Sequence, residues 1–170
     1  RSVLPEPLNL GFEELAGDIP RGWIASPLLP AFGYSFSAKA EMPFAGSRCA
    51  LLSRLPGPRY GQASAEFIER IDAKTYRGKR VRLTAAVRAK VAAGSSARLT
   101  LQARAVGPGP VNTMRDSPIV DAHWKMYSIE LVVPANAATL TIGGALIGDG
   151  SACFDDFRLE VIYLRQPFPG

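Results

Sequence analysis

The sequence has few of the residues on which most catalytic and metal sites depend. Its 170 residues include one histidine, His123, and two cysteines. A lone histidine is more often a structural or surface residue than a catalytic base, and two cysteines without metal-ligand spacing exclude the usual zinc site. No Gly-x-Ser-x-Gly, His-Glu-x-x-His or phosphate-cradling glycine-rich motif occurs. These absences argue against a serine hydrolase, a zinc peptidase and a nucleotide-binding enzyme.

Long runs of one kind of residue are also missing. No five like charges occur in succession, and no apolar stretch is long enough to span a bilayer. The net charge of +5 comes from 20 Lys and Arg against 15 Asp and Glu, and these residues are spread along the whole chain. Neither aromatic stacking platforms nor a recognition helix accompanies them. We therefore expect no nucleic-acid binding and no membrane span.

Glycine and proline are plentiful, at 16 and 14 residues, which favours many short strands joined by turns. The clearest strand pattern lies in residues 81–106, where apolar and polar residues alternate on both sides of a Gly-Ser turn. A period of two gives each strand one apolar and one polar face. The short connection predicts an antiparallel hairpin, and a second sheet must cover its apolar face. The apolar positions are Val81, Leu83, Ala85, Val87, Ala89, Leu99, Leu101, Ala103 and Ala105.

Turn residues divide the rest of the chain into further strands. We predict them at residues 8–13, 34–40, 48–55, 124–133, 139–147 and 153–163. Residues 62–73 fit a helix or a strand, and their place before another strand favours a strand. The predicted fold class is all-β, a two-sheet antiparallel β-sandwich of jelly-roll type. Residues 1–7 are expected to form an extended lead-in, 8–164 the sandwich domain, and 165–170 a tail or linker.

The two cysteines, Cys49 and Cys153, lie at opposite ends of the chain, each in a predicted strand. Neighbouring strands could bring them together as a disulfide. They could equally be two buried, small apolar side chains. The sequence leaves both alternatives open.

Two carboxylates near the ends of the chain, Glu13 and Asp155, are candidate metal ligands. Calcium prefers carboxylate and carbonyl oxygens in irregular loops, and the two ends of a jelly roll often run close together. Asp155 shares the parity of the apolar residues of the last strand, so we expect it to point inward, where a charge needs a partner. Two alternatives are carboxylates that cap turns, and a glycoside hydrolase pair formed by Glu13–Glu14 and Asp155–Asp156.

A series of short motifs along the chain indicates a resemblance to a known family. It consists of Asn-Leu-Gly-Phe-Glu at 9–13, Ile-Pro-Arg-Gly-Trp at 19–23, Tyr-Arg-Gly-Lys-Arg-Val-Arg-Leu at 76–83, the strand at 124–134, Gly-Asp-Gly at 148–150 and Phe-Asp-Asp-Phe at 154–157. Across residues 8–163 these motifs resemble the galactose-binding-like jelly roll of bacterial carbohydrate-binding modules, which are attached to xylanases and related secreted hydrolases. The resemblance implies two antiparallel sheets, a secreted or periplasmic location, and a structural calcium held by Glu13 and Asp155.

Sugar-binding members of that family stack exposed aromatic side chains on pyranose rings. Trp23 and Trp124 fall at positions that the family uses mainly for packing, so Tyr34 and Tyr60, in or beside loops, are the freer aromatic candidates. The polar face of the predicted hairpin is basic, and its arginines would suit an anionic ligand. The alternative is a solvated sheet face without a ligand. The candidate binding residues on this face are Arg82, Gln102 and Arg104, with Arg88 and Arg98 beside them.

Together these features predict a non-catalytic domain that is similar to a carbohydrate-binding module, an accessory module of a secreted protein. A carbohydrate or an acidic polymer is the expected ligand, and a neighbouring catalytic domain is the expected partner. Two alternatives remain. One is a purely structural or docking domain of a larger hydrolase or peptidase, and the other is a carboxylate-dependent glycoside hydrolase.

Overall fold

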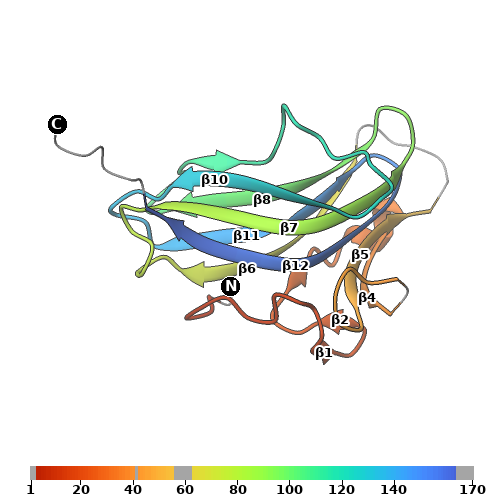
Figure 1. Ribbon diagram of the computed structural model, residues 1–170, viewed down its shortest axis with the longest axis horizontal. Coiled ribbons are helices and arrows are strands. Elements are labelled where there is room, and N and C mark those ends of the chain that lie inside the picture. Colours follow the sequence, from red (N-terminus) through yellow and green to blue (C-terminus); the bar gives the residue numbers. More distant parts are fainter. Residues whose placement is uncertain (1–2, 41, 56–62, 164–170) are drawn as a thin grey trace, which may run out of the picture.

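The computed structural model describes residues 3–40, 42–55 and 63–163, and most of these residues belong to two sheets packed face to face (Figure 1). The first sheet, here called the β7 sheet, has the strand order β10 (Lys125–Val132), β7 (Arg80–Val91), β12 (Gly150–Ile162), β5 (Cys49–Arg54) and β4 (Tyr34–Lys39). The second, the β11 sheet, has the order β3 (Ile24–Ala25), β6 (Ser64–Asp72), β11 (Thr139–Ile147), β8 (Ser96–Arg104) and β9 (Val111–Asn112).

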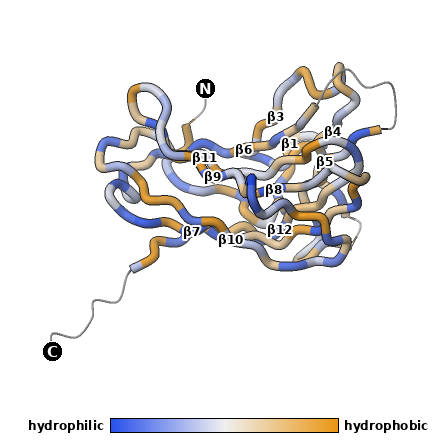
Figure 2. The backbone as a smooth tube through the Cα atoms, turned by 90° about the horizontal axis from the view of Figure 1, so that it is seen from above, coloured by the Kyte–Doolittle hydropathy of each residue, from blue (hydrophilic) through white to orange (hydrophobic). Residues whose placement is uncertain are grey.

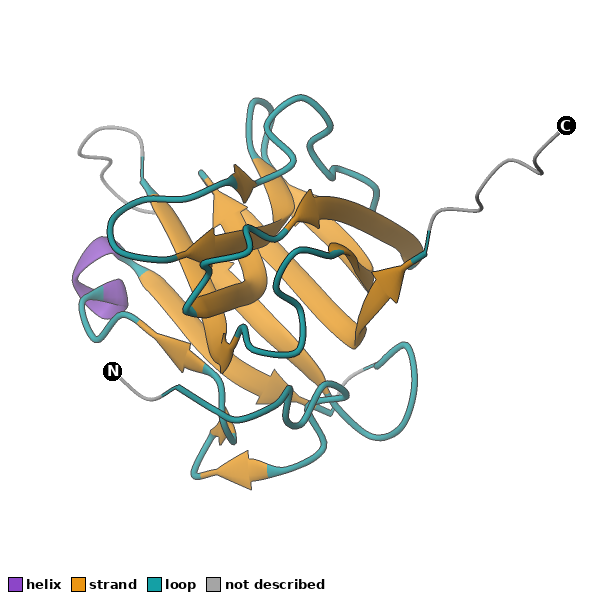
Figure 3. Cartoon of the chain, turned by 90° about the vertical axis from the view of Figure 1, so that its left-hand side faces the viewer, coloured by secondary structure: helices purple, strands orange, loops and turns teal. Residues whose placement is uncertain are grey.

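All strand pairs within the two sheets are antiparallel, which confirms the predicted sandwich. β1 (Leu15–Ala16) and β2 (Ile19–Pro20) form a small separate pair. In the described part of the chain the one helical element is the 3-10 turn η1 (Leu29–Phe32), which Figure 3 shows at the edge of the strands. No helix within the described ranges is long and apolar enough to cross a membrane. Within the ambiguous segment 62–73, the structure has strand β6 at Ser64–Asp72.

The predicted hairpin at residues 81–106 is wrong, although both of its strands exist. β7 pairs with β10 and β12, whereas β8 pairs with β11 and β9, so the two strands belong to opposite sheets. The turn at Ala92–Ser95 therefore carries the chain across the sandwich. Alternation with a period of two predicts a strand with one buried face, but it is the same whether the next strand lies beside the first or opposite it.

The apolar faces of β7 and β8 consequently meet across the core. Their alternating apolar residues from Val81 to Ala103 are at most 1% exposed. Figure 2 shows hydrophilic and hydrophobic stretches following one another along the strands. Sheets that pack face to face bury one face each and leave the other to solvent. The two outer faces are therefore accessible to a ligand.

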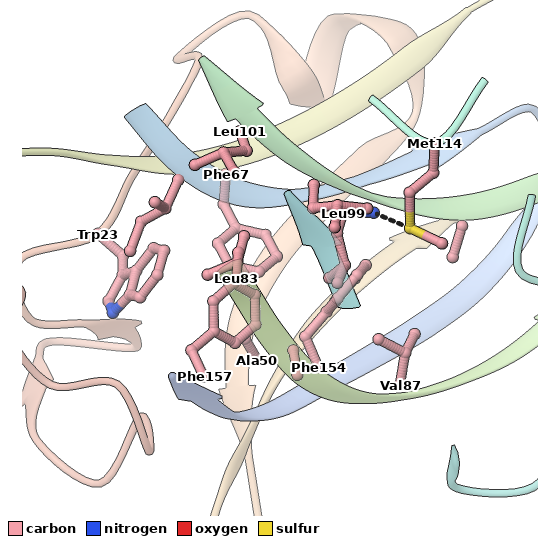
Figure 4. Close-up of a cluster of buried hydrophobic side chains, with 14 of the residues drawn as sticks. Trp23, Ala50, Phe67, Leu83, Val87, Leu99, Leu101, Met114, Phe154 and Phe157 are labelled. Atoms are coloured by element: carbon pink, nitrogen blue, oxygen red, sulfur yellow. Dashed lines mark hydrogen bonds between the residues drawn. The ribbon is translucent and has the colours of Figure 1, made fainter. Parts of the chain in front are cut away.

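An aromatic cluster lies between the sheets at the end occupied by the N-terminal segment (Figure 4). Phe67 of β6 is fully buried, and the rings of Phe12, Trp23, Phe36, Phe154 and Phe157 lie with their centroids 4.8–6.1 Å from its own. Trp23 is 3% exposed and donates its indole N–H to the carbonyl of Asn9, at 2.9 Å. The prediction that Trp23 packs in the core is confirmed.

The N-terminal segment differs from the prediction. Residues 8–13 are not a strand, because Asn9 and Phe12 have φ angles of 54° and 60° and turn the chain. The Asn9 side chain holds this turn with hydrogen bonds to the carbonyls of Glu14 and Arg21. Asn is one of the few residues that adopts a left-handed conformation readily, and its side chain can bond nearby backbone groups. Earlier in the predicted lead-in, Leu4 pairs with Ile71 of β6. The predicted tail at 165–170 lies outside the described residues.

The inward direction predicted for Asp155 is also wrong, although the residue is buried. The register of β12 against β7 shifts between Asp155 and Arg158, and Asp156 has a φ of 48°. This bulge puts Phe154 and Phe157, three residues apart, on the core side. Asp155 therefore lies on the outer side of the β7 sheet and is buried there by a loop. A bulge changes the parity of a strand, and alternation alone does not reveal it.

Candidate functional site

A groove of about 230 Å³ crosses the outer face of the β11 sheet. Its lining comes from β6, β8, β9 and β11 and from the residue after β9: Glu66, Ile68, Arg70, Thr100, Gln102, Arg104, Val111, Thr113 and Thr141. A second hollow of about 390 Å³ continues the groove over β3 and shares Glu66, Ile68 and Arg70 with it. The strands alternate between core and surface, so every second residue along β6 and β8 reaches this face.

One row of side chains runs across the groove at right angles to the strands. Arg70 is in register with Thr141, Thr141 with Gln102, and Gln102 with Val111. Neighbouring strands are about 4.8 Å apart, so this row of four strands spans about 14 Å. Three consecutive positions of the row offer a guanidinium, a hydroxyl and an amide. This is a row of hydrogen-bonding groups long enough for an extended polar ligand.

Two polar atoms on β8 lack partners among the described residues. Thr100 is 9% exposed and lines the groove, and its Oγ1 makes no hydrogen bond. The Nε atom of Arg98, the preceding outward residue, is likewise buried without a partner. A buried donor or acceptor that loses its hydrogen bond costs about 1–3 kcal/mol. A hydroxyl-bearing ligand in the groove would supply the bond that Thr100 lacks.

The groove carries both charge and apolar surface. The lining contains two cations, Arg70 and Arg104, and one carboxylate, Glu66, so its net charge is positive. Ile68 and the 56% exposed Val111 provide the apolar contacts. Among its described lining residues no side chain is aromatic. The groove therefore differs from a platform on which sugar rings stack, and a ligand would be held mainly by hydrogen bonds.

The structure brings two of the predicted binding residues together and separates the third. Gln102 and Arg104 both line the groove. Arg82 lies on β7 and so belongs to the opposite sheet, where its Nη2 donates to Glu130 Oε2 at 2.9 Å. Arg80 forms an ion pair with the same carboxylate. Since the predicted hairpin does not form, its polar face is divided between the two outer surfaces of the sandwich.

Tyr34 does not provide the exposed aromatic surface that we predicted. Tyr34 is 2% exposed, and its hydroxyl donates to the carbonyl of Ala63 or of Gly148, at 2.9 and 2.6 Å. It therefore packs in the core instead of contacting a ligand, because a buried tyrosine hydroxyl seeks such partners. Tyr60 lies outside the described residues. Trp124 is half-buried, packs against Phe44 and lies under the Arg88 guanidinium.

Sequence reasoning missed Arg70, Thr100 and Thr141. Arg70 has the parity of Glu66 and Ile68 on β6, which was recognisable once the segment was assigned as a strand. Its place in the same row as Gln102 was not recognisable, because the two residues are joined through Thr141 of β11, a strand from a later part of the chain. The groove is built from strands that are far apart in sequence, and no local pattern records their order.

The two predicted metal ligands meet at one loop. Asp155 Oδ2 accepts hydrogen bonds from the backbone N–H groups of Phe44 and Ala45, at 3.1 and 3.0 Å. Glu13 Oε1 accepts from those of Ser47 and Arg48, at 2.8 and 3.2 Å. Residues from both ends of the chain therefore hold the loop between β4 and β5.

Burial raises the pKa of Asp155 to about 6, against the opposing effect of three backbone N–H bonds, and the Glu13 charge adds to the rise. Two carboxylates directed at one loop are hard oxygen ligands of the kind that calcium takes. In the described ranges, no third His, Cys, Asp or Glu joins them to make a metal cluster. Further ligands would have to be backbone carbonyls or water. A calcium ion at this loop would share the two carboxylates with the backbone N–H groups that already donate to them.

Two residues of the hydrolase alternative, Glu14 and Asp156, lie in ordinary surface contacts. Glu14 forms an ion pair with Arg21, and Asp156 with Arg158. The side chain of His123 is 92% exposed in a loop and contacts Asp121. A general acid or base needs a position beside a bound substrate, and these groups are outside the groove.

Solved structures establish what the chain resembles in three dimensions. The C-terminal family 22 carbohydrate-binding module of Clostridium thermocellum Xyn10B matches with a TM-score of 0.62 at 14% identity, over 89% of each chain. The CBM22-1 xylan-binding domain of Paenibacillus barcinonensis Xyn10C matches with a TM-score of 0.57 at 13% identity, over 97% of this chain and 100% of that one. The CBM22-1–GH10 modules of Clostridium thermocellum Xyn10B, complexed with xylohexaose, match at 0.61 and 14%, over 99% of this chain and 30% of that one.

These similarities confirm the predicted resemblance to the jelly roll of carbohydrate-binding modules, and modules of families 16 and 61 share the fold as well. No protein-family profile matches the sequence, and no curated protein matches it either. At 13–14% identity the similarity concerns the fold. Function has to be argued from the groove.

Proposed function

We propose that this chain is a non-catalytic carbohydrate-binding module and that the groove on the β11 sheet is its binding site. The observation that carries the proposal is the buried, unpartnered hydroxyl of Thr100, which lies next to the row formed by Arg70, Thr141 and Gln102. A sugar hydroxyl both donates and accepts, so it can satisfy Thr100 whichever role that side chain takes. The Clostridium thermocellum module, whose fold is similar, was studied for the role of its cleft residues in ligand binding.

The groove chemistry suits a sugar chain. The Gln102 amide both donates and accepts, and the Arg70 and Arg104 guanidinium groups donate to hydroxyls or to carboxylate substituents. Ile68 and Val111 would contact the C–H surface of the sugar rings. Binding of this kind needs no proton transfer and no bond cleavage, so the proposed function requires no catalytic residues.

The proposal extends to the context of the module. We place it beside a catalytic domain of a secreted or periplasmic enzyme, because a similar module of Clostridium thermocellum Xyn10B adjoins a GH10 module. The substrate of that enzyme would be the polysaccharide that the groove binds. The role of the module is then to keep the enzyme on its substrate.

A glycan array with matched double variants tests the binding site. We expect the wild-type chain to bind a defined set of polysaccharides, and Arg70→Ala/Arg104→Ala to bind them about tenfold to hundredfold more weakly, because hydrogen bonds from charged groups contribute about 1.5–3 kcal/mol. Arg80→Ala/Arg82→Ala removes the same charge from the opposite face and serves as the control. Equal losses of affinity in the two variants would show that only the net charge of the protein matters. That result would contradict binding in the groove.

The alternative function, a structural or docking domain, predicts a blank array. Exposed apolar side chains such as Leu28, Phe32 and Leu55 are the surface that such a domain would use. An array that includes both neutral and acidic polysaccharides therefore separates the two functions directly. Only a binding module gives selective signals on it.

We also propose that Glu13 and Asp155 hold a structural calcium ion at the loop between β4 and β5. In a calcium-loaded sample, a chelator is expected to lower the melting temperature by several degrees, because the ion stabilises the folded state in which its ligands are assembled. Glu13→Gln and Asp155→Asn should each remove most of this response. If the chelator does not change the melting temperature of the calcium-loaded wild type, no structural calcium is bound. The two carboxylates would then act only as acceptors for backbone N–H groups.

A further inference from the structure

A second hollow lies on the outer face of the β7 sheet, on the other side of the molecule from the groove. Its volume is about 340 Å³, and strands β4, β5, β7 and β12 line it. The lining residues are Lys39, Leu51, Ser53, Arg88, Lys90, Ser151 and Cys153. The proposed carbohydrate-binding function uses none of them.

Every charged side chain in the described lining of this hollow is basic. Lys39, Arg88 and Lys90 come from two different strands and converge on it, and no acidic residue is among its described lining. A cleft that carries one sign of charge concentrates small ligands of the opposite sign. The hollow is therefore suited to a small anion.

A sulfur atom lies in the lining of this cationic hollow. Cys153 of β12 is in register with Leu51 of β5, and Cys49 lies two residues along β5 on the same face. The two thiols share a hydrogen bond, and Arg88 Nη2 lies 3.9 Å from Cys153 Sγ. Cys153 is 7% exposed and lines the hollow, whereas Cys49 is fully buried. A reagent that enters the hollow thus meets Cys153 first.

We propose that Cys153 is a thiol modification site that forms mixed disulfides with small anionic disulfides held by Lys39 and Lys90. The hollow holds an anionic disulfide within reach of the Cys153 sulfur, because its cations line the same space as that sulfur. The hollow supplies both the cations and the space for the incoming molecule. This site is independent of the carbohydrate groove, so either proposal can fail without the other.

The step is a thiol–disulfide exchange. The Cys153 sulfur attacks one sulfur of the incoming disulfide, and a new S–S bond forms as the old one breaks. The departing sulfur leaves with the bonding electron pair and takes up the proton that Cys153 loses. The incoming disulfide is the oxidant, and one small thiol is released for each Cys153 that is modified.

Cys49 contacts Cys153 but is not placed to resolve this product. The two residues are diagonal across the strand pair, and diagonal neighbours have Cα atoms about 7–8 Å apart. A protein disulfide needs a Cα separation of about 4.4–6.8 Å, so closure would require the strands to move. Both cysteines are free in the structure, and the mixed disulfide is the expected end product.

Intact-mass spectrometry on the whole chain tests the proposal. The chain is treated with oxidised glutathione, which is anionic, with bis(2-hydroxyethyl) disulfide, which is neutral, and with cystamine, which is cationic. Each rate is divided by the rate of free cysteine with the same reagent. We expect one glutathione adduct, mapped to Cys153, at a normalised rate about tenfold or more above that of cystamine. High salt should reduce this ratio, because it screens the lysines.

Variants assign the effect to named residues. Cys153→Ser should form no adduct, whereas Cys49→Ser should still form it. Lys39→Gln/Lys90→Gln should keep the adduct and lose the preference for the anionic reagent. An adduct on Cys49, a loss of two hydrogens without an adduct, or equal normalised rates for the three reagents would each overturn the proposal.

Discussion

The largest loss of stability is expected from Phe67→Ala, which should lower the free energy of unfolding by about 3–5 kcal/mol. Phe67 is fully buried, and five aromatic rings surround it, contributed by the β7 sheet and by the N-terminal segment. Its removal would leave a cavity that these rigid rings cannot fill. Urea denaturation followed by circular dichroism measures the change without depending on the fluorescence of Trp23, which contacts Phe67.

Phe36→Ala is the matched control for this prediction. The Phe36 ring stacks on Phe67 with an interplanar angle of 11°, but it is half-buried on the edge strand β4. We expect a loss of about 1–2 kcal/mol, because less apolar surface returns to water. If Phe67→Ala cost no more than Phe36→Ala, the cluster would not be the centre of the core.

The second large effect is expected at Glu69, a carboxyl group on the core side of β6. It is fully buried, its Oε1 accepts a hydrogen bond from the backbone N–H of Leu8 at 2.8 Å, and its Oε2 has no partner among the described residues. Burial raises its pKa from 4.5 to about 7, with the Leu8 bond acting in the opposite direction. The folded protein therefore holds this proton more tightly than the unfolded chain does.

The stability that depends on Glu69 should be highest below pH 4.5, should fall as the pH rises toward 7, and should be constant above that. Glu69→Gln removes this slope. We expect the variant to equal the wild type at pH 4 and to exceed it by about 2–3 kcal/mol at pH 8, since one pKa unit corresponds to about 1.4 kcal/mol. Urea denaturation across this pH range gives both curves.

Glu66→Gln controls for the loss of a negative charge on the same strand, because Glu66 is exposed on the opposite face. Asp155 contributes a pH dependence of its own, which cancels when each variant is compared with the wild type. If the wild type is as stable as Glu69→Gln at pH 8, burial does not raise the pKa of Glu69 in the folded state, and the prediction is wrong.

The strands were largely predictable from the sequence. β11 has the predicted bounds, β7 follows the alternation from Val81 to Ala89, and Trp23 packs in the core as expected. These features depend on neighbours in sequence, where the period of two and the turn residues carry the information. The family resemblance added the two-sheet arrangement, and the solved structures bear it out.

The binding face was less predictable, because it depends on which strands become neighbours. Arg82 and Arg104 have equivalent places in the alternating pattern, yet they lie on opposite outer faces. Tyr34 follows a turn and was expected at the surface, but its hydroxyl is held by two backbone carbonyls in the interior. At Asp155 a single bulge reverses the parity. In each case, tertiary pairing decides a direction that the local sequence leaves open.

The two outer faces therefore differ in chemistry. The β11 sheet presents a groove of amide, hydroxyl and guanidinium groups, whereas the β7 sheet presents a cationic hollow with a thiol. The proposed carbohydrate site and the proposed modification site can be occupied at the same time, because no residue lines both. A module of this kind could bind its polysaccharide on one side while the other remains accessible.

The central claim, that carbohydrate binds on the β11 sheet, is tested most directly by an NMR titration of the 15N-labelled chain. The ligand is the soluble oligosaccharide that corresponds to the strongest array signal. The account predicts that shifts concentrate on the amides of β6, β8 and β11, around Arg70, Gln102 and Thr141, with the β7 sheet unaffected. Shifts centred instead on β5, β7 and β12, around Arg82 and Lys90, would contradict it.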